Sequence, residues 1–255
     1  MNIPGRWLFF YFAGLVLFPA VINANEFISS DQGSMLVELY TSEGCSSCPP
    51  AEHYLNKLNL DEHLWETVFP MAFHVDYWDH LGWKDRFSNA AFSLRQKQYA
   101  SYLKHSSIYT PAFFINANVW YPGFYNKPLT VKSAAITGVL QFSMKNNQIH
   151  ARYSNSTMTD QKLILNTAIL GMGLTTKIER GENAGRLAEH EFVVLSYQTR
   201  VSQKLEWQLS VPEIVFQGET GRAIIAWVTR EDNPRPLQIA GGLLENNIQH
   251  GHGNH

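Results

Sequence analysis

Two cysteines in one short motif are the residues of this 255-residue sequence best suited to carry chemistry. Cys45 and Cys48 flank two serines, four residues after the apolar run Met35–Tyr40 and directly before a Pro-Pro pair typical of a helix start. Unpaired N–H groups and the dipole at such a helix end stabilise a thiolate, and the second cysteine lies close enough to resolve a mixed disulfide. The motif predicts a redox pair, with Cys45 as the exposed nucleophile and Cys48 as its buried partner.

An inert structural disulfide is the alternative interpretation of this pair. Closing so short a loop removes little chain entropy, about 2 kcal/mol against about 4.7 kcal/mol for a loop of about one hundred residues. Two cysteines are also too few for a disulfide-stapled scaffold or a four-cysteine zinc site. These counts favour a functional role for the pair.

Glu38 and the pair Thr110-Pro111 are the next candidates. Glu38 interrupts the apolar run seven positions before Cys45, which predicts a buried carboxylate beneath the site, with a raised pKa suited to proton exchange with Cys48. The alternative is a carboxylate at a strand edge, with its oxygens in water.

A proline just before a strand cannot donate to the ladder, and a cis bond there would expose the Thr110 backbone for substrate pairing. Because cis bonds are only about 5–6% of X–Pro bonds, the sequence alone favours trans.

The predicted substrate-binding residues are Thr110, Pro111, Tyr109 and Trp78. Trp78 belongs to a crowded polar and aromatic segment, His74–Trp83, at the end of a second strand-like run. Strand ends near a helix start border the crevice of open sheets, so this segment could tune Cys45 or line a groove. A well-packed loop with hydrogen-bonded polar groups is the interpretation we favour.

A metal site is a different class of function that starts from the same residues. The two thiolates of Cys45 and Cys48 with the imidazole of His74 could hold Cu(I), as a copper-binding or copper-delivery module. That site needs reduced cysteines, an added demand in an oxidising compartment. The histidines of the C-terminal tail HGHGNH could add a metal-gathering element, although a solvated chain end is the favoured interpretation.

The composition excludes several other classes of protein. Lys plus Arg is 20 and Asp plus Glu is 22, so the formal net charge is −2, which argues against a nucleic-acid footprint or a polybasic membrane contact. Hydrophobic residues make up 45% of the chain and charged residues 16%. Such a chain can bury a sizeable core.

Residues 1–24 are predicted to be a secretory signal. Arg6 precedes an apolar run of 12 residues, Trp7–Phe18, and Ala24 offers a cleavage position. The run is shorter than the roughly 20 residues that a membrane span needs, so we expect no stable span after cleavage. An uncleaved anchor is the alternative interpretation. The predicted location is periplasmic or secreted.

Periodicity predicts two segments of different character. In residues 25–146, predicted strands and helices alternate for most of the segment. In chain order they are the strand 35–40, a helix from Pro49, the strand 71–75, a helix from a Ser88 cap to about 104, the strand 112–115, its hairpin partner 119–121 and a closing helix 130–145. This order predicts an α/β domain with a mixed sheet and helices on both faces.

Residues 147–245 are strand-rich and are predicted to form a separate, all-β sandwich-like unit, followed by the tail 246–255. Within this unit the segment RGENAGR lacks the Gly-Lys-Ser/Thr ending of a phosphate loop. It is predicted to be a turn in which Arg180, Glu182 and Arg186 pair.

The chain resembles a family of exported bacterial thioredoxin-like proteins labelled only as a domain of unknown function. The resemblance rests on the segments LVELYTSEGCSSCPPAE, FHVDYWDHLGWKDRF, YTPAFFINA and RGENAGR, and it spans nearly the whole mature chain. It implies a thioredoxin-like fold in which Glu38, Cys45, Cys48 and Thr110-Pro111 occupy the redox site. Because the family has no assigned reaction, the resemblance implies an activity less directly than a fold.

These observations predict an exported thiol-disulfide oxidoreductase whose partners are protein or small-molecule thiols and disulfides. Its predicted catalytic residues are Cys45, Cys48 and Glu38, and we expect no bound cofactor. The Ser-Ser dipeptide between the cysteines leaves the direction of electron flow open. Besides the Cu(I) module, the alternative is a redox-silent protein that binds a partner through its strand-rich unit.

Overall fold

The structure is a computed structural model that describes residues 24–30, 34–123, 125, 128–129, 138–155 and 162–245. The predicted signal up to residue 23, the tail 246–255 and residues 130–137 of the predicted closing helix lie outside the described residues. No helix among the described residues is long and apolar enough to cross a membrane.

Strands dominate the described part of the chain. The helical elements are α1 (Pro49–Asn56), the 3-10 helix η1 (Lys57–Leu60) and α2 (Ala90–Tyr102). The strands are β1 (Asn25–Ile28), β2 (Met35–Thr41), β3 (Val68–His74), β4 (Ala112–Ile115), β5 (Asn118–Trp120), β6 (Val139–Lys145), β7 (Gln148–Ser154), β8 (Leu163–Met172), β9 (Leu174–Lys177), β10 (Leu187–His190), β11 (Val193–Ser202), β12 (Glu206–Ser210), β13 (Gly221–Arg230) and β14 (Gln238–Leu243).

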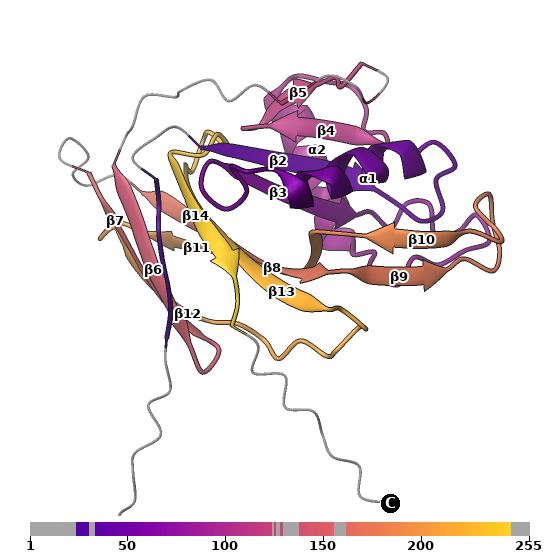
Figure 1. The fold of residues 1–255 in the computed structure, drawn as a ribbon. Helices are drawn as coiled ribbons and strands as arrows, with labels where there is room; N and C mark the ends of the chain where they lie inside the picture. The colour runs from indigo at the N-terminus through magenta and orange to yellow at the C-terminus, as the bar shows by residue number, and fades with distance from the viewer. Residues whose placement is uncertain are drawn as a thin grey trace, which may run out of the picture.

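One long sheet runs through the molecule. Its eight strands follow the order β14-β13-β8-β11-β3-β2-β4-β5, with β3 parallel to both β2 and β11 and the other neighbours antiparallel. A four-stranded sheet, β1-β6-β7-β12, and the separate hairpin β9–β10 complete the described fold. Figure 1 shows this hairpin extending beside α1.

The long sheet separates two hydrophobic cores. Along β13, Ile225 and Trp227 belong to the core that also receives α1, α2, β2 and β3, whereas Ile224 and Ala226 belong to the core under the four-stranded sheet. All four side chains are fully buried. The uninterrupted apolar run Ala223–Val228 of this strand is thus explained by its two covered faces.

The predicted fold class is wrong. The described residues form 14 strands and only two α-helices, not a thioredoxin-like α/β domain with flanking helices plus a C-terminal all-β sandwich-like unit. Val193 of β11 pairs with Ala72 of β3, so β8, β11, β13 and β14 extend the sheet that contains β2. The predicted division at residues 146 and 147 stays a prediction, but strands from both sides of it share each of the two larger sheets.

The predicted closing helix is also wrong where it can be compared. Residues 139–145 form β6, in which Leu140 and Phe142 are buried and Val139 and Gln141 are exposed. This period of two is that of a half-buried strand. The other predicted elements of the first segment are confirmed within a few residues, except that Asn89, not Ser88, caps α2 by accepting a hydrogen bond from the Ala91 N–H.

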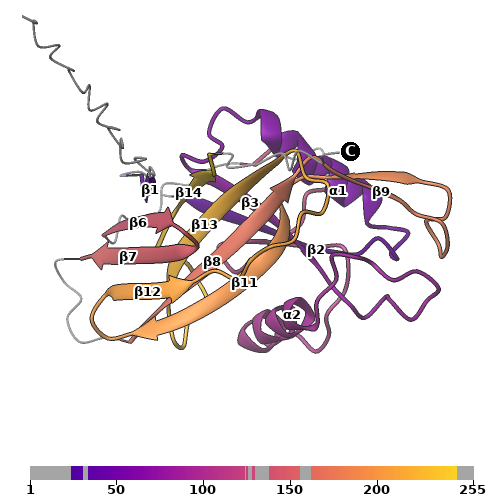
Figure 2. The ribbon, with the colours of Figure 1, turned by 90° about the horizontal axis from the view of Figure 1, so that it is seen from below.

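α1 and α2 lie on opposite faces of the sheet, as Figure 2 shows. On the α2 face, the Arg95 guanidinium lies 2.6 Å from the Glu38 carboxylate and also donates to the hydroxyls of Tyr99 and Tyr197. The Tyr99 hydroxyl donates to the second Glu38 oxygen at 2.6 Å. Every group of this network is satisfied, and burial raises the pKa of Tyr99 well above its ordinary value.

We predict that the Glu38–Arg95 pair fixes α2 to the sheet. Arg95→Met should lower the free energy of unfolding by about 3–5 kcal/mol, because it leaves a buried carboxylate without its counter-charge. Urea denaturation measures the change. Adding Glu38→Leu should recover most of the loss, and Arg152→Ala, which removes an exposed ion pair with Glu206, should change stability by at most about 0.5 kcal/mol. An Arg95→Met protein as stable as the wild type contradicts this prediction.

Candidate functional site

The two cysteines form a disulfide at the start of α1. Cys48 is the N-cap residue of the helix, and the two Cα atoms are 5.4 Å apart. Both cysteines are 0% exposed, so the prediction of an exposed Cys45 is wrong. A thiol partner reaches this bond only after part of its surroundings moves.

The helix start offers fewer backbone donors than predicted. Pro49 and Pro50, its first two residues, have no N–H, and the next two N–H groups donate to the Cys48 carbonyl. The sulfur of Cys45 instead lies 3.3 Å from the hydroxyl of Ser47. That hydroxyl, together with the helix dipole, is the group placed to stabilise a Cys45 thiolate.

The loop between β9 and β10 holds the disulfide segment in place. The buried Asn183 side chain donates to the carbonyls of Glu43 and Cys45, both at 2.9 Å. The Glu182 carboxylate accepts a longer bond from the Ser46 N–H. Both residues belong to RGENAGR, which was predicted only to be a turn, and the predicted pairing of Glu182 with two arginines is not among the ion pairs of the described residues.

Glu38 is not brought to the cysteines. Side chains alternate along β2, so Glu38 points to α2 while Thr41 points to α1 and donates to the Glu52 carboxylate at 2.5 Å. Sequence distance from Cys45 placed Glu38 near the motif but could not tell which face of the sheet it occupies.

Thr110-Pro111 reaches the site through Trp78. The peptide bond between the two residues is cis, contrary to the trans bond favoured by sequence statistics. The Trp78 indole N–H donates to the Thr110 hydroxyl at 2.7 Å, and the Trp78 side chain lies against Gly44, the residue before Cys45. Tyr109 is 45% exposed, and its carbonyl accepts a hydrogen bond from Gln96. Trp78 therefore links the predicted docking residues to the motif.

A buried cluster of histidines and carboxylates lies next to the disulfide segment, at the carboxyl ends of β2 and β3. The Nδ1 of His74 is 2.7 Å from Asp85, whose carboxylate also accepts the Glu43 N–H. Burial lowers the pKa of His74, but the Asp85 charge and hydrogen bond outweigh it, so the pKa is raised. The same pairing lowers the pKa of Asp85 against the effect of its burial.

His190, the last residue of β10, joins this cluster from the other side. Its Nδ1 lies 2.8 Å from Glu52 of α1, and its Nε2 lies 3.3 Å from Glu43. Burial lowers its pKa, but the two carboxylates together raise it to about 10. Asn56 of α1 fixes the segment by donating to the Glu189 carbonyl at 2.8 Å and accepting the Glu191 N–H.

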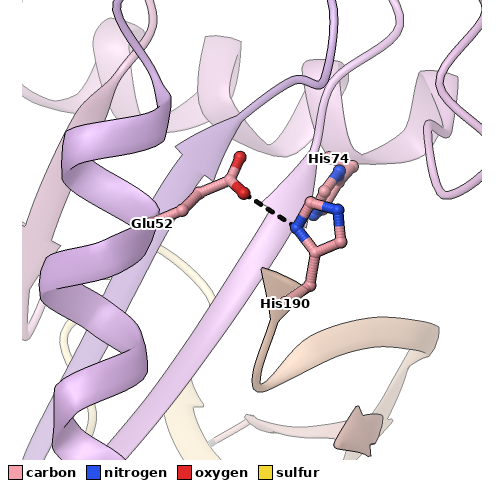
Figure 3. Close-up of side chains that lie close together, drawn as sticks. All are labelled: Glu52, His74 and His190. Atoms are coloured by element: carbon pink, nitrogen blue, oxygen red, sulfur yellow. Dashed lines mark ion pairs between the residues drawn. The ribbon is translucent and has the colours of Figure 1, made fainter. Parts of the chain in front are cut away.

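Figure 3 shows Glu52, His74 and His190 converging from a helix, a strand and the end of the hairpin. Within the described residues, this is the one group of three His, Cys, Asp or Glu side chains placed to hold a metal ion. The predicted set of Cys45, Cys48 and His74 is therefore not brought together. Sequence reasoning missed Glu52 and His190, and no local motif marks either residue.

A cavity of about 360 Å³ opens beside this cluster. Glu43, Glu52 and His190 line it from the buried side, and Asn183 and Arg186 line it from the β9–β10 loop. The cavity gives small molecules or ions a route from solvent to the cluster.

The fold and site define a strand-rich protein with a buried Cys-x-x-Cys disulfide beside a histidine–carboxylate cluster. The chain belongs to the DUF1223 family, described as a protein of unknown function, whose match covers residues 36–229. No curated protein matches this sequence.

Two solved structures are similar to this chain. The crystal structure of protein AGR_C_4864 from Agrobacterium tumefaciens has 20% identity and a TM-score of 0.58, covering 88% of this chain and 100% of that chain. HBP35 of Porphyromonas gingivalis has 13% identity and a TM-score of 0.48, covering 85% of this chain and 76% of that one. The first likeness establishes a shared fold and nothing about chemistry.

We predict that Asn183 limits access to the disulfide. Asn183→Ala removes two hydrogen bonds, each worth about 0.5–1.5 kcal/mol, and should speed reduction by dithiothreitol roughly tenfold. Release of free thiols over time gives the rate. Arg180→Ala, a change at an exposed residue of the same loop, is the control and should leave the rate unchanged. Equal reduction rates for the wild type, Asn183→Ala and Arg180→Ala would show that the loop does not limit access to the disulfide.

Proposed function

We propose that this protein is an exported thiol-disulfide oxidoreductase that exchanges electrons with dithiol or disulfide partners through Cys45 and Cys48. The observation that carries the proposal is a disulfide between cysteines only three positions apart, with the Ser47 hydroxyl at the Cys45 sulfur. A bond across so short a loop contributes little to folding, but its two sulfurs are suited to exchange.

The exchange balances with a dithiol partner. One partner thiolate attacks the Cys45 sulfur, forms a mixed disulfide and releases Cys48 as a thiolate with the electron pair of the broken bond. The second partner thiolate then attacks the partner sulfur and releases Cys45 as a thiolate. Two electrons thus pass from the partner to the cysteine pair, and the reverse sequence reduces a partner disulfide.

The Ser47 hydroxyl donates to Cys45 when it is a thiolate, which makes Cys45 the better leaving group and the better nucleophile at neutral pH. Glu38 has no part in this proposal, since it lies on the α2 face. Release of the Asn183 contacts opens the segment to a partner, and protons then exchange with solvent.

Docking of an extended peptide beside the motif is part of the proposal. Within the described residues, the backbone N–H and C=O of Thr110 form no hydrogen bond, so they are available for strand-like pairing. Tyr109 and Trp78 flank this position. The apolar run of residues 7–18 and the disulfide itself support export to an oxidising compartment, periplasmic or extracellular.

Cys48→Ala should accumulate mixed disulfides through Cys45, because the resolving thiol is missing. Non-reducing electrophoresis of exported extracts detects the trapped partners, and Cys45→Ala/Cys48→Ala is the control.

The reduction potential of the wild-type pair should lie in the range of catalytic pairs, about −120 to −270 mV, and not below about −300 mV as in structural disulfides. A potential below that limit, with no trapped partner, refutes the enzyme. If Cys45→Ser/Cys48→Ser keeps its full cellular effect, the chain is a redox-silent binding module.

Ser47→Ala should raise the pKa of the Cys45 thiol by roughly one unit, since a hydrogen bond to a charged group contributes about 1.5–3 kcal/mol and one unit corresponds to about 1.4 kcal/mol. The pH dependence of Cys45 alkylation in the Cys48→Ala background measures this pKa. Ser46→Ala is the matched control, because Ser46 is exposed and lies on the same loop. If the two serine variants give the same pKa, Ser47 does not activate the nucleophile.

A further inference from the structure

We propose that Glu52, His74 and His190 form a binding site for a divalent transition-metal ion, with Zn²⁺ as the ion that suits their donor atoms best. One ligand atom from each residue lies within 4.8 Å of the others, and all three residues are buried. The proposal concerns residues that the thiol-disulfide exchange does not use.

His74 is prepared to act as a ligand. Its Nδ1 is committed to Asp85 at 2.7 Å, whereas its Nε2 is buried and has no hydrogen-bond partner in the described structure. Metal-binding histidines characteristically donate one ring N–H to a carboxylate, which fixes the ring and leaves the other nitrogen for the ion. A buried imidazole nitrogen without a partner is costly unless a ligand satisfies it.

His190 and Glu52 repeat this arrangement from the other side of the cluster. The Nε2 of His190 faces Glu43 at 3.3 Å, so its Nδ1 is the nitrogen turned to Glu52. One Glu52 oxygen accepts the Thr41 hydroxyl, and the other faces His190. His74 and Glu52 therefore each have one atom held by a hydrogen bond and one atom free for the cluster, whereas neither ring nitrogen of the buried His190 has a hydrogen-bond partner in the described structure.

The charge of the cluster favours a cation. Three carboxylates, those of Glu43, Glu52 and Asp85, surround two imidazoles. These carboxylates make the buried cluster a negatively charged environment, which a divalent ion offsets.

The donor types select the kind of ion. Mg²⁺ and Ca²⁺ prefer oxygen ligands only, whereas two imidazoles with one carboxylate suit Zn²⁺ and related first-row ions. Zinc bonds of about 2.0–2.1 Å place tetrahedral donors about 3.4 Å apart, so ligand atoms that lie within 4.8 Å of one another move together by at most about 1.4 Å on binding. The adjacent cavity of about 360 Å³ leaves a further coordination position open to small ligands.

The test is Zn²⁺ titration of the full chain after treatment with EDTA, followed by competition with a chromogenic chelator. We expect one tight equivalent per chain. Glu52→Gln and His74→Gln should each weaken binding at least 100-fold. Asp85→Asn changes no ligand, but it alters the group that positions His74 and removes one carboxylate charge, so it should weaken binding 10- to 100-fold. Circular dichroism checks that each variant is folded.

Three controls separate this site from other binders. His53→Gln changes an exposed histidine next to Glu52 on α1 and should leave affinity unchanged. Replacement of His250, His252 and His255 by Gln should also keep the tight equivalent. Cys45→Ser/Cys48→Ser should keep it as well, so loss of redox activity and loss of metal binding are independent results.

The proposal is overturned if Glu52→Gln binds Zn²⁺ like the wild type, if the tight equivalent disappears with the tail histidines, or if no equivalent binds below millimolar concentration. Should the buried variants fail to fold, zinc X-ray absorption of the zinc-loaded tail variant decides. Two imidazole nitrogens with oxygen ligands support the site, and sulfur ligands or oxygen ligands alone refute it.

Discussion

The parallel pairing of β11 with β3, at Val193 and Ala72, is the contact on which the rest of the architecture depends. The Ala72 N–H donates to the Phe192 carbonyl at 2.8 Å, so the chain must enter the sheet here directly after β10. This junction joins β8, β13 and β14 to β2 and β3 in one sheet. It also sets His190 against His74, because His190 precedes Val193 by three residues and His74 follows Ala72 by two.

The two faces of β2 and β3 have different chemistry because each buries a different kind of polar group. The α2 face holds Glu38 and Arg95 in a network that satisfies both charged groups and fixes a helix. The α1 face holds the disulfide, Glu52 and His74, and it retains a buried imidazole nitrogen without a partner. Buried polar groups that lack partners are where function is expected, because their desolvation is not offset by the fold alone.

Short sequence patterns predicted the features that depend on neighbouring residues, such as the start of a helix. Features that depend on contacts between distant parts of the chain, such as the burial of a cysteine, could not be predicted in this way. The disulfide between Cys45 and Cys48, the Pro49 helix start and most early strands follow from short windows of sequence. The burial of Cys45 does not, since Asn183 lies 138 positions away. The expected role of Glu38 in proton exchange with Cys48 is not supported, because its side chain points to the α2 face of the sheet. Neighbouring residues of a strand point to opposite faces, so a position one residue along would have faced α1. The signal and the tail are predictions that no described residue tests.

The β9–β10 hairpin carries both Asn183, which holds the disulfide segment, and His190, which faces Glu52. Its two strands pair only with each other, so a movement of the hairpin would leave the strand pairing of the long sheet intact. A ligand that binds His190 while Asn183 holds the disulfide segment would therefore disfavour opening of that segment. By linkage, opening of the segment would weaken the binding of that ligand by the same free energy. The hairpin is thus the element through which binding at the proposed metal site would be linked to opening of the disulfide segment.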